Sequence, residues 1–188
     1  MAMEIKRNSK TLVKEKTALL IIDIQQRIID VMQDKDCLIE NTLKLIKGMK
    51  ILNVPIYYTE QYPKGLGQTI DVIKNELKFD AMQKMSFSCS GAADLFKDLI
   101  DKNISQLVVC GIESHVCVQQ TVLDLLENGF QVNVAADAVS SRKEYDKKTA
   151  LDRMRDNKAE ITTTESILFE LLNICGTAEF KEIIRIIK

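Results

Sequence analysis

Five short runs of apolar or β-branched residues are spread along the chain, and segments with helical spacing separate them. The five runs cover Thr17–Asp23, Val54–Glu60, Ser105–Ile112, Phe130–Ala136 and the stretch AEITTTE at residues 159–165. Runs that are apolar at consecutive positions are typical of strands buried on both faces of a parallel sheet. Strands that alternate with helices restrict the fold to the α/β class, with right-handed crossovers between the strands.

The segments between these runs carry signals for helices and for their ends. Apolar residues recur at helical spacing between Leu38 and Leu52, and Asn128-Gly129 is typical of a helix end. Two pairs of residues have the spacing of a capping box, which predicts a helix start at each of them. The two pairs are Ser141 with Glu144, and Thr162 with Glu165.

The length and composition predict one globular domain spanning residues 1–188. The chain is 46% hydrophobic and 28% charged, which is ordinary for a globular protein with a sizeable core. It contains no repeat, low-complexity tract or linker rich in proline and glycine. The seven glycines and two prolines mark no position where the chain would divide into two domains.

The formal net charge is −1, so no strong electrostatic field favours nucleic acid or an anionic membrane as a partner. No apolar run reaches the roughly 20 residues that span a bilayer, and the first residues lack the apolar segment of a secretory signal. We therefore expect no nucleic acid and no membrane among the partners. A cytoplasmic location is expected, and a mitochondrial one is left open.

The cysteine and histidine content argues against disulfides and against a metal centre. The five cysteines are an odd number and contain no CxxC pair, which favours a reducing compartment over a disulfide framework. His115 is the single histidine, so a zinc site would depend on scattered thiols. We expect no metal and no other cofactor.

Ligands of parallel α/β sheets bind beyond the carboxyl ends of the strands, and this rule selects two residues. Asp23 closes the first strand directly after a run of apolar residues, where a carboxylate is costly to bury unless it is paired. Cys117 follows the third strand, in the expected first turn of a helix, where the helix dipole lowers a thiol pKa. The alternatives are a capping or loop acid for Asp23 and a small core residue for Cys117.

Other polar residues near these strand ends carry weaker signals. His115 precedes Cys117 by two residues, and on a helix this spacing turns the side chains about 200° apart. A catalytic Cys117 would therefore use a carboxylate as its base. The stretch YPKGLGQT lacks the GxxxxGK[ST] pattern of a phosphate loop, and composition alone makes Lys84 one surface lysine among many.

Several stretches together resemble the isochorismatase-like cysteine hydrolases, in the order in which that family carries them. They cover most of the chain from about residue 12 to residue 175, and the last two are the most specific. The stretches are LLIIDIQ, PIYYTEQYPKGLGQT, KMSFSC, LVVCGIESHVCVQQTVLDLLENGFQVNVAADAVSSR and AEITTTESILFEL. The resemblance implies a three-layer Rossmann-like fold with a parallel six-stranded sheet flanked by helices, one strand more than the periodicity predicts.

The resemblance also implies the residues of an active site. It assigns a catalytic triad to Asp23, Lys84 and Cys117, with the carboxylate as base and the thiol as nucleophile. A cis peptide bond between Ile112 and Glu113 is implied, together with an oxyanion hole formed by the backbone N–H groups of Glu113 and Cys117. Substrate-binding roles fall on Gln61 and Glu113. Cys117 would then be the cysteine with enhanced reactivity near neutral pH.

Departures from better-defined relatives restrict the substrate. Nicotinamidases of this family bind a metal through an aspartate and two histidines, and the corresponding stretch YYTEQYPKGLGQT has no histidine. Isochorismatases that cleave the vinyl ether lack the cysteine. The sequence is therefore similar to the metal-free amidohydrolases, such as N-carbamoylsarcosine amidohydrolase, which predicts a hydrolase of non-peptide C–N bonds.

The alternatives to hydrolysis are a non-catalytic interaction or scaffold protein on the same fold and a thiol sensor that uses Cys117. The physiological substrate is not defined by the sequence. The resemblance further implies a homo-oligomer, and the last helix offers an apolar face at Phe180, Ile183, Ile184 and Ile187. That face can equally cover the protein's own core.

Overall fold

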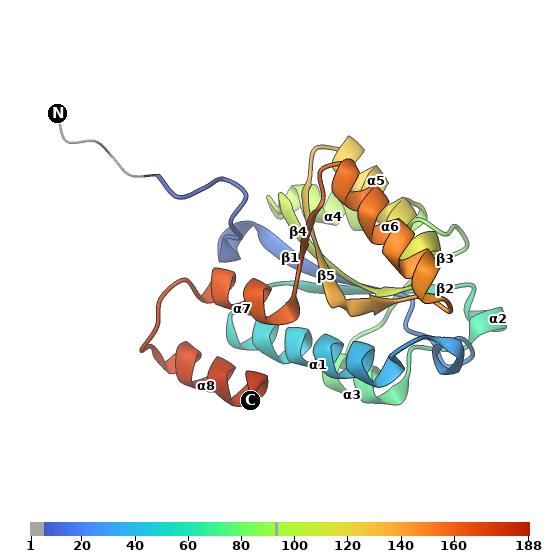
Figure 1. Cartoon of the computed structure of the whole chain (residues 1–188), viewed down its shortest axis with the longest axis horizontal. Coiled ribbons are helices and arrows are strands. Elements are labelled where there is room, and N and C mark those ends of the chain that lie inside the picture. Colours follow the sequence, from blue (N-terminus) through green and yellow to red (C-terminus); the bar gives the residue numbers. More distant parts are fainter. Residues whose placement is uncertain (1–5, 93) are drawn as a thin grey trace.

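A six-stranded parallel sheet forms the centre of the molecule (Figure 1). The computed structural model describes residues 6–92 and 94–188. The strands lie in the order β3-β2-β1-β4-β5-β6, and every neighbouring pair is parallel. They are β1 (Thr17–Ile22), β2 (Ile56–Gln61), β3 (Met82–Lys84), β4 (Gln106–Ile112), β5 (Gln131–Ser140) and β6 (Glu160–Thr162).

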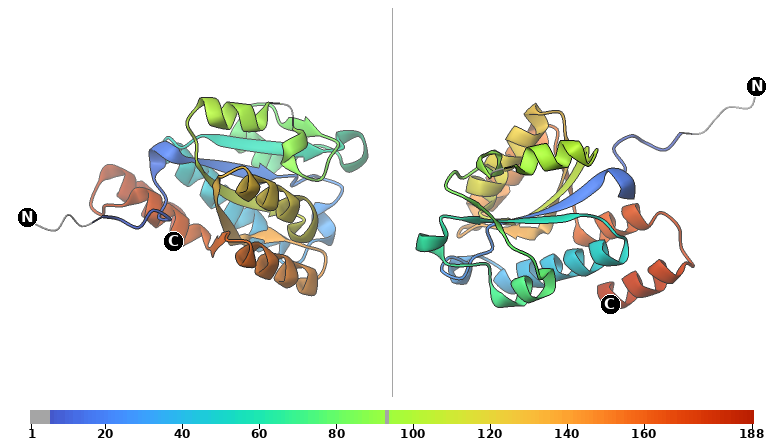
Figure 2. Two further views of the ribbon diagram at one scale, coloured as in Figure 1. Left: turned by 90° about the horizontal axis from the view of Figure 1, so that it is seen from above. Right: turned by 180° about the vertical axis from the view of Figure 1, so that it is seen from behind.

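Helices cover both faces of the sheet and complete three layers (Figures 1 and 2). One face carries α1 (Lys35–Ile51), α3 (Asp71–Leu77), α7 (Thr164–Leu172) and α8 (Ala178–Ile187). The other carries α4 (Leu95–Asp101), α5 (Gln119–Glu127) and α6 (Glu144–Asp156). The expected three-layer α/β fold is confirmed. None of the helices described is long and apolar enough to cross a membrane.

Shorter helical turns connect the larger elements. They are 3-10 turns at Lys14–Lys16, Ile29–Val31 and Cys89–Gly91, the four-residue helix α2 (Pro63–Leu66), and a π-helical turn at Ser114–Val118. The stretch YPKGLGQT therefore forms a short helix with proline at its first position, which suits proline because the amide there needs no partner within the helix. The π-helical turn leads directly into α5.

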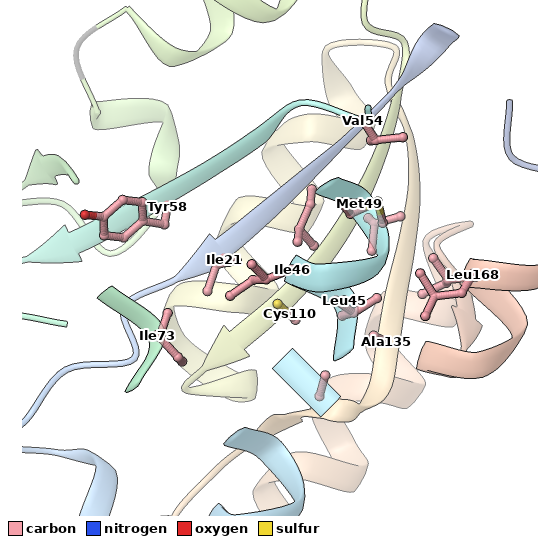
Figure 3. Packing of buried hydrophobic residues seen from close by; sticks show 14 of the residues in the cluster. Ile21, Leu45, Ile46, Met49, Val54, Tyr58, Ile73, Cys110, Ala135 and Leu168 are labelled. Carbon is pink, nitrogen blue, oxygen red and sulfur yellow. The ribbon is translucent and has the colours of Figure 1, made fainter. Parts of the chain in front are cut away.

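The two central strands, β1 and β4, pack on both faces, and every one of their residues is buried. In β1, Leu19 and Ile21 belong to the core that α1 covers, and Leu20 and Ile22 belong to the core on the opposite face. This two-residue alternation follows from the pleat of a strand. Figure 3 shows the first core, in which Ile21 and Cys110 of the sheet lie near Leu45, Ile46 and Met49 of α1.

The sheet differs from the periodicity at two places. The strand that the periodicity does not predict is β3. It contains three residues, MQK, and is too short and too polar to form a recognisable run. The fourth predicted strand was expected to close at Asp137, but β5 continues to Ser140. Its pairing with β4 shifts register between Val109 and Gly111, which is where β5 extends past the expected end.

A helix begins close to each of the two predicted starts, but neither capping box forms. Helix α6 begins at Glu144 and follows Lys143, and Ser141 is buried and contacts His115 instead. Helix α7 begins at Thr164, whose backbone N–H donates to the carboxylate of Asp137 at 2.9 and 3.1 Å. A side chain of β5 therefore satisfies this helix start, and a local spacing rule cannot detect a partner 27 residues away.

The apolar face of α8 is used within the chain. Ile183 is fully buried, and Phe180 and Ile187 pack against the same core, where α8 lies against α1. This outcome confirms the simpler alternative for the face, so α8 gives no support to a homo-oligomer.

Candidate active site

The candidate site lies where the strand order reverses between β1 and β4. From β1 the chain moves outward through β2 to β3, and it then returns to add β4 on the other side. Such switch points leave a crevice beyond the carboxyl ends of the two central strands. Asp23 follows β1, Glu113 follows β4, and Cys117 lies in the π-helical turn after Glu113. Lys84 is the last residue of β3.

Gly111 allows the two central strands to approach closely just before the site. Its φ is +120°, in the region that favours glycine, and a Cβ atom there would lie 2.1 Å from the backbone oxygen of Ile22. Any side chain would push β4 away from β1. The glycine therefore fixes the spacing between the strand ends that carry Asp23 and Glu113.

Asp23 and Lys84 form a buried ion pair. The Lys84 Nζ lies 2.5 Å from Asp23 Oδ2, and the side chains are 0% and 4% exposed. Lys84 also donates to the backbone oxygens of Phe87 at 2.8 Å and Ser86 at 3.2 Å. An ammonium group has three N–H donors, so all three are used within the protein. This lysine is a fixed component of the site and not a surface residue.

Thr59 supports the carboxylate from the other side. Its buried hydroxyl donates to Asp23 Oδ1 at 2.7 Å. Burial raises the pKa of the Asp23 carboxyl above its ordinary value, while the Lys84 ammonium and the hydrogen bonds to the carboxylate oppose the rise. A carboxylate with a raised pKa is a better proton acceptor, which is the property that a general base requires.

Cys117 is buried in the π-helical turn and lines the same pocket as Asp23. Burial raises the pKa of its thiol, and the neighbouring negative charge of Asp23 raises it further. The expectation of a thiol acidified by a helix terminus is therefore wrong for the protein without substrate. Loss of hydration and a nearby carboxylate raise the pKa of the thiol, so the thiol keeps its proton near neutral pH.

We predict that alkylation of Cys117 requires more alkaline pH than alkylation of a free thiol. A thiol in solution has a pKa of about 8.5, and the raised pKa of Cys117 moves its titration above this value. Iodoacetamide labelling followed by peptide mapping across a pH series measures the effect, with a small cysteine peptide in the same tube as reference. A Cys117 profile that levels off at lower pH than the reference peptide would contradict the prediction.

A pocket with a volume of about 220 Å³ connects these groups. Its lining comprises Asp23, Ile28, Gln61, Leu66, Phe87, Ile112, Glu113, Val116 and Cys117. Two of the predicted triad residues therefore face the pocket directly, and Lys84 lies behind Asp23. The residues assigned to substrate binding, Gln61 and Glu113, also line it. The walls are otherwise apolar.

The backbone before Cys117 has an unusual course. The peptide bond between Ile112 and Glu113 is cis, as the resemblance implies. The carbonyl oxygen of Glu113 accepts hydrogen bonds from the N–H groups of both Val116 and Val118, at 3.0 and 3.2 Å. The hydrogen bond from Val118 spans five residues, which is the spacing of a π-helical turn, a form that is frequent at functional sites. The N–H of Cys117 lies between these two donors in the chain.

Three supporting residues escaped the sequence reasoning. Thr59 donates a hydrogen bond to Asp23, and Arg142 donates one to Glu113. Gln25 is fully buried and forms hydrogen bonds with the backbone N–H and carbonyl of Gln61 and with the carbonyl of Gly67. Gln25 and Arg142 lie beyond the ends of β1 and β5, and Thr59 lies within β2, two residues before its end. The strand-end rule that selected Asp23 could have included Gln25 and Thr59, but their partners are distant in sequence.

His115 lies away from the pocket. Its Nδ1 is 3.0 Å from the Ser141 hydroxyl, and its Nε2 is 3.9 Å from a carboxylate oxygen of Asp146. The side chain is partly buried and is absent from the pocket lining, in agreement with the spacing argument. Within residues 6–92 and 94–188, no group of three or more His, Cys, Asp or Glu residues is arranged to hold a metal ion.

Comparisons with known proteins agree with this fold and with the order of its elements. Residues 17–166 match the isochorismatase domain family. Isochorismatase family protein 1B of Dictyostelium discoideum is 38% identical over 188 residues, which cover 97% of this chain and 91% of the relative. The structure of MAR1 ribonuclease from Caenorhabditis elegans superimposes with a TM-score of 0.86 at 34% identity, covering 94% and 91% of the two chains.

A second similar structure is the YcaC gene product of Escherichia coli, described as an octameric hydrolase of unknown specificity. It has a TM-score of 0.86 at 24% identity and covers 96% and 92% of the two chains, which demonstrates the shared fold. The matched domain and the relatives above 30% identity establish that this chain belongs to the isochorismatase family. Membership of this family supports a hydrolase role.

Proposed function

We propose that the protein hydrolyses a small amide or a related non-peptide C–N bond through a thioester on Cys117. The observation that carries the proposal is the buried Asp23–Lys84 pair at the base of a small pocket that Cys117 also lines. A thiol, a carboxylate of raised pKa and a cation in one pocket are the components of nucleophilic catalysis with a general base.

In the first half of the reaction, Asp23 accepts the thiol proton while the sulfur attacks the carbonyl carbon. The backbone N–H groups of Glu113 and Cys117 stabilise the negative oxygen of the tetrahedral intermediate. When the C–N bond breaks, protonated Asp23 gives its proton to the departing amine. The acyl group remains on sulfur as a thioester, and Asp23 is again a carboxylate.

In the second half, Asp23 removes a proton from water, which attacks the thioester carbon. The second intermediate collapses, the acid is released, and Asp23 returns the proton to the thiolate of Cys117. Lys84 never donates its proton in this scheme. It keeps the carboxylate in place through a fixed ion pair and lowers the cost of negative charge on Asp23 while sulfur carries a partial charge.

The ribonuclease name of the Caenorhabditis elegans neighbour raises RNA as another substrate. Protein surfaces that bind RNA are generally rich in lysine and arginine, because phosphates dominate the affinity. This chain has a formal net charge of −1, and Asp23 and Glu113 bring two carboxylates to the pocket. These features favour a small molecule over a polyanion.

A screen of amides, ureides and carbamoyl compounds tests the proposal, with RNA as a separate substrate. Amine release is measured together with the intact mass of the protein after rapid acid quenching. Amine release and an acyl adduct on wild type, both absent from the Cys117→Ala variant, would support the thioester route. RNA cleavage that survives in the Cys117→Ala variant, or no adduct with any compound, would favour a different activity or a non-catalytic role.

We also predict that the protein is a homo-oligomer. The sequence resemblance implies assembly, and large apolar side chains are exposed at Tyr62, Met85 and Phe87, where β2 and β3 end. The backbone N–H of Tyr62 donates to the carbonyl of Lys84, so these segments are neighbours. Sedimentation analysis at micromolar concentration measures the mass. A monomer of 21.3 kDa would contradict the prediction.

A further inference from the structure

The pocket presents negatively charged side chains to a ligand and no positively charged one among the residues described. Its lining includes two acidic residues, Asp23 and Glu113, and no lysine, arginine or histidine among the residues described. The buried cation Lys84 donates its three N–H groups to Asp23 and to two backbone oxygens. It has no donor left for a carboxylate of a substrate.

Glu113 and Gln61 offer acceptors to the pocket. Arg142 binds Glu113 through its backbone N–H at 3.2 Å and its Nε at 3.0 Å, and both hydrogen bonds end on Oε2. Oε1 accepts no hydrogen bond from the residues described. The Gln61 Nε2 donates one of its two N–H groups to the backbone oxygen of Met85 at 3.1 Å, and Oε1 of this side chain accepts no hydrogen bond from the residues described.

The remaining walls are apolar. Ile28, Leu66, Phe87, Ile112 and Val116 surround a volume of about 220 Å³. Since a water molecule occupies about 30 Å³ of liquid, the space corresponds to roughly seven waters. A ligand of that size that fills the pocket must place much of its surface against hydrocarbon. A charged group within it would lose its hydration without gaining a partner of opposite charge.

We infer that the pocket selects small uncharged compounds that present N–H donors and an apolar substituent, and that it rejects compounds bearing a carboxylate. This inference deepens the proposed function and rests on it for the identity of the reaction. The amide N–H groups of such a compound meet the Oε1 atoms of Glu113 and Gln61. Its carbonyl oxygen then lies toward the backbone N–H groups of Glu113 and Cys117, to which the proposed function assigns the negative oxygen of the intermediate.

The charge selection can be measured at the thiol itself, without any hydrolysis. Iodoacetamide and iodoacetate deliver similar groups to a cysteine and differ in charge. The rate ratio of the two reagents at Cys117 cancels the nucleophilicity of the thiol. Cys37 and Cys175 are exposed and provide reference ratios in the same molecule. We expect the preference for iodoacetamide to be at least about tenfold larger at Cys117, because an anion loses hydration against the apolar lining and meets carboxylates there but no cation among the lining residues.

Two variants should move this ratio in opposite directions. Glu113→Gln removes one negative charge, so the preference for the neutral reagent should fall. Arg142→Ala removes the cation paired with Glu113, so the preference should rise. Arg155→Ala is the matched control, since Arg155 pairs with Asp152 on the exposed surface of α6 and should leave the ratio unchanged. If Glu113→Gln does not fold, the direction of the Arg142→Ala change decides the question.

Equal ratios at Cys117 and at the exposed cysteines would overturn the inference, as would an Arg142→Ala ratio that does not rise. Two amides then separate failure of the inference from failure of the proposed function. Butanamide is uncharged. Succinamate has the same amide group and chain, with a carboxylate in place of the terminal methyl group. Hydrolysis of both at similar rates would retain the hydrolase and overturn the charge selection. A skewed alkylation ratio without hydrolysis of any amide would retain the selection and overturn the proposed function.

Discussion

The Asp23→Asn substitution is expected to lower the rate of amide hydrolysis by about 10²–10⁴-fold, the usual contribution of a positioned general base. Asparagine keeps the shape of the side chain and can still accept the hydrogen bond from Thr59, but it cannot take the thiol proton. Because burial, the largest cause of the raised pKa of Cys117, persists in this variant, few molecules carry a thiolate without the base. Turnover of the best amide from the screen, measured by amine release, provides the test.

The His115→Ala variant is the matched control for this experiment. His115 contacts Ser141 and lies near Asp146, outside the pocket lining, so its loss should change turnover only slightly. Circular dichroism establishes that each variant is folded before rates are compared. A His115→Ala variant as inactive as Cys117→Ala, or an Asp23→Asn variant with normal turnover, would refute the assignment of the carboxylate as base.

The Lys84→Met substitution is expected to destabilise the fold by about 3–5 kcal/mol, because it leaves a buried carboxylate without its partner. The side chain of Asp23 is almost fully buried, and the carbonyls of Ser86 and Phe87 lose their donor as well. The double variant Asp23→Asn/Lys84→Met removes the stranded charge and should recover a large part of the loss. Urea unfolding of wild type, both single variants and the double variant measures the coupling.

The loss of stability caused by Lys84→Met should depend on pH, and the direction of this dependence follows from the pKa of Asp23. Burial already raises the pKa of Asp23 in the presence of Lys84, and removing the ammonium raises it further. A carboxyl whose folded-state pKa exceeds its unfolded value is protonated in both states at low pH, where its burial costs least. The cost appears as pH rises through the folded-state pKa. Lys84→Met should therefore be more destabilising at mildly alkaline than at mildly acidic pH, and exposed Lys97→Met should be nearly neutral at both.

The central strands were predictable because burial on both faces demands continuous apolar runs, and β1 and β4 satisfy that demand. Strand β3 was not, since three residues at the sheet edge need little apolar surface and leave no periodicity. Asp23 and Cys117 could be selected from their positions beyond strand ends. Lys84 entered only through the resemblance, because nothing in its local sequence distinguishes a buried lysine from an exposed one.

The features that sequence reasoning missed depend on contacts between distant segments. The start of α7 is satisfied by Asp137, and the pKa of Cys117 follows from burial and from Asp23, which is 94 positions earlier in the chain. Local rules for capping and for helix dipoles describe an isolated helix in water. In this protein, Asp137 takes the place of a local capping residue at the start of α7. Burial and Asp23 raise the pKa of Cys117, whereas the local rule predicts that it falls.

The position of Lys84 on β3 couples the site to a three-residue strand at one edge of the sheet. Strand β3 pairs only with β2, through three residues, whereas Asp23 and Cys117 extend from the central strands. Edge strands open in fluctuations that leave the rest of a domain folded, with free energies below that of global unfolding. Each such opening would separate the cation from the carboxylate. The fraction of molecules with an intact Asp23–Lys84 pair would then be set by the free energy of opening β3, which hydrogen exchange measures, and not by the stability of the core.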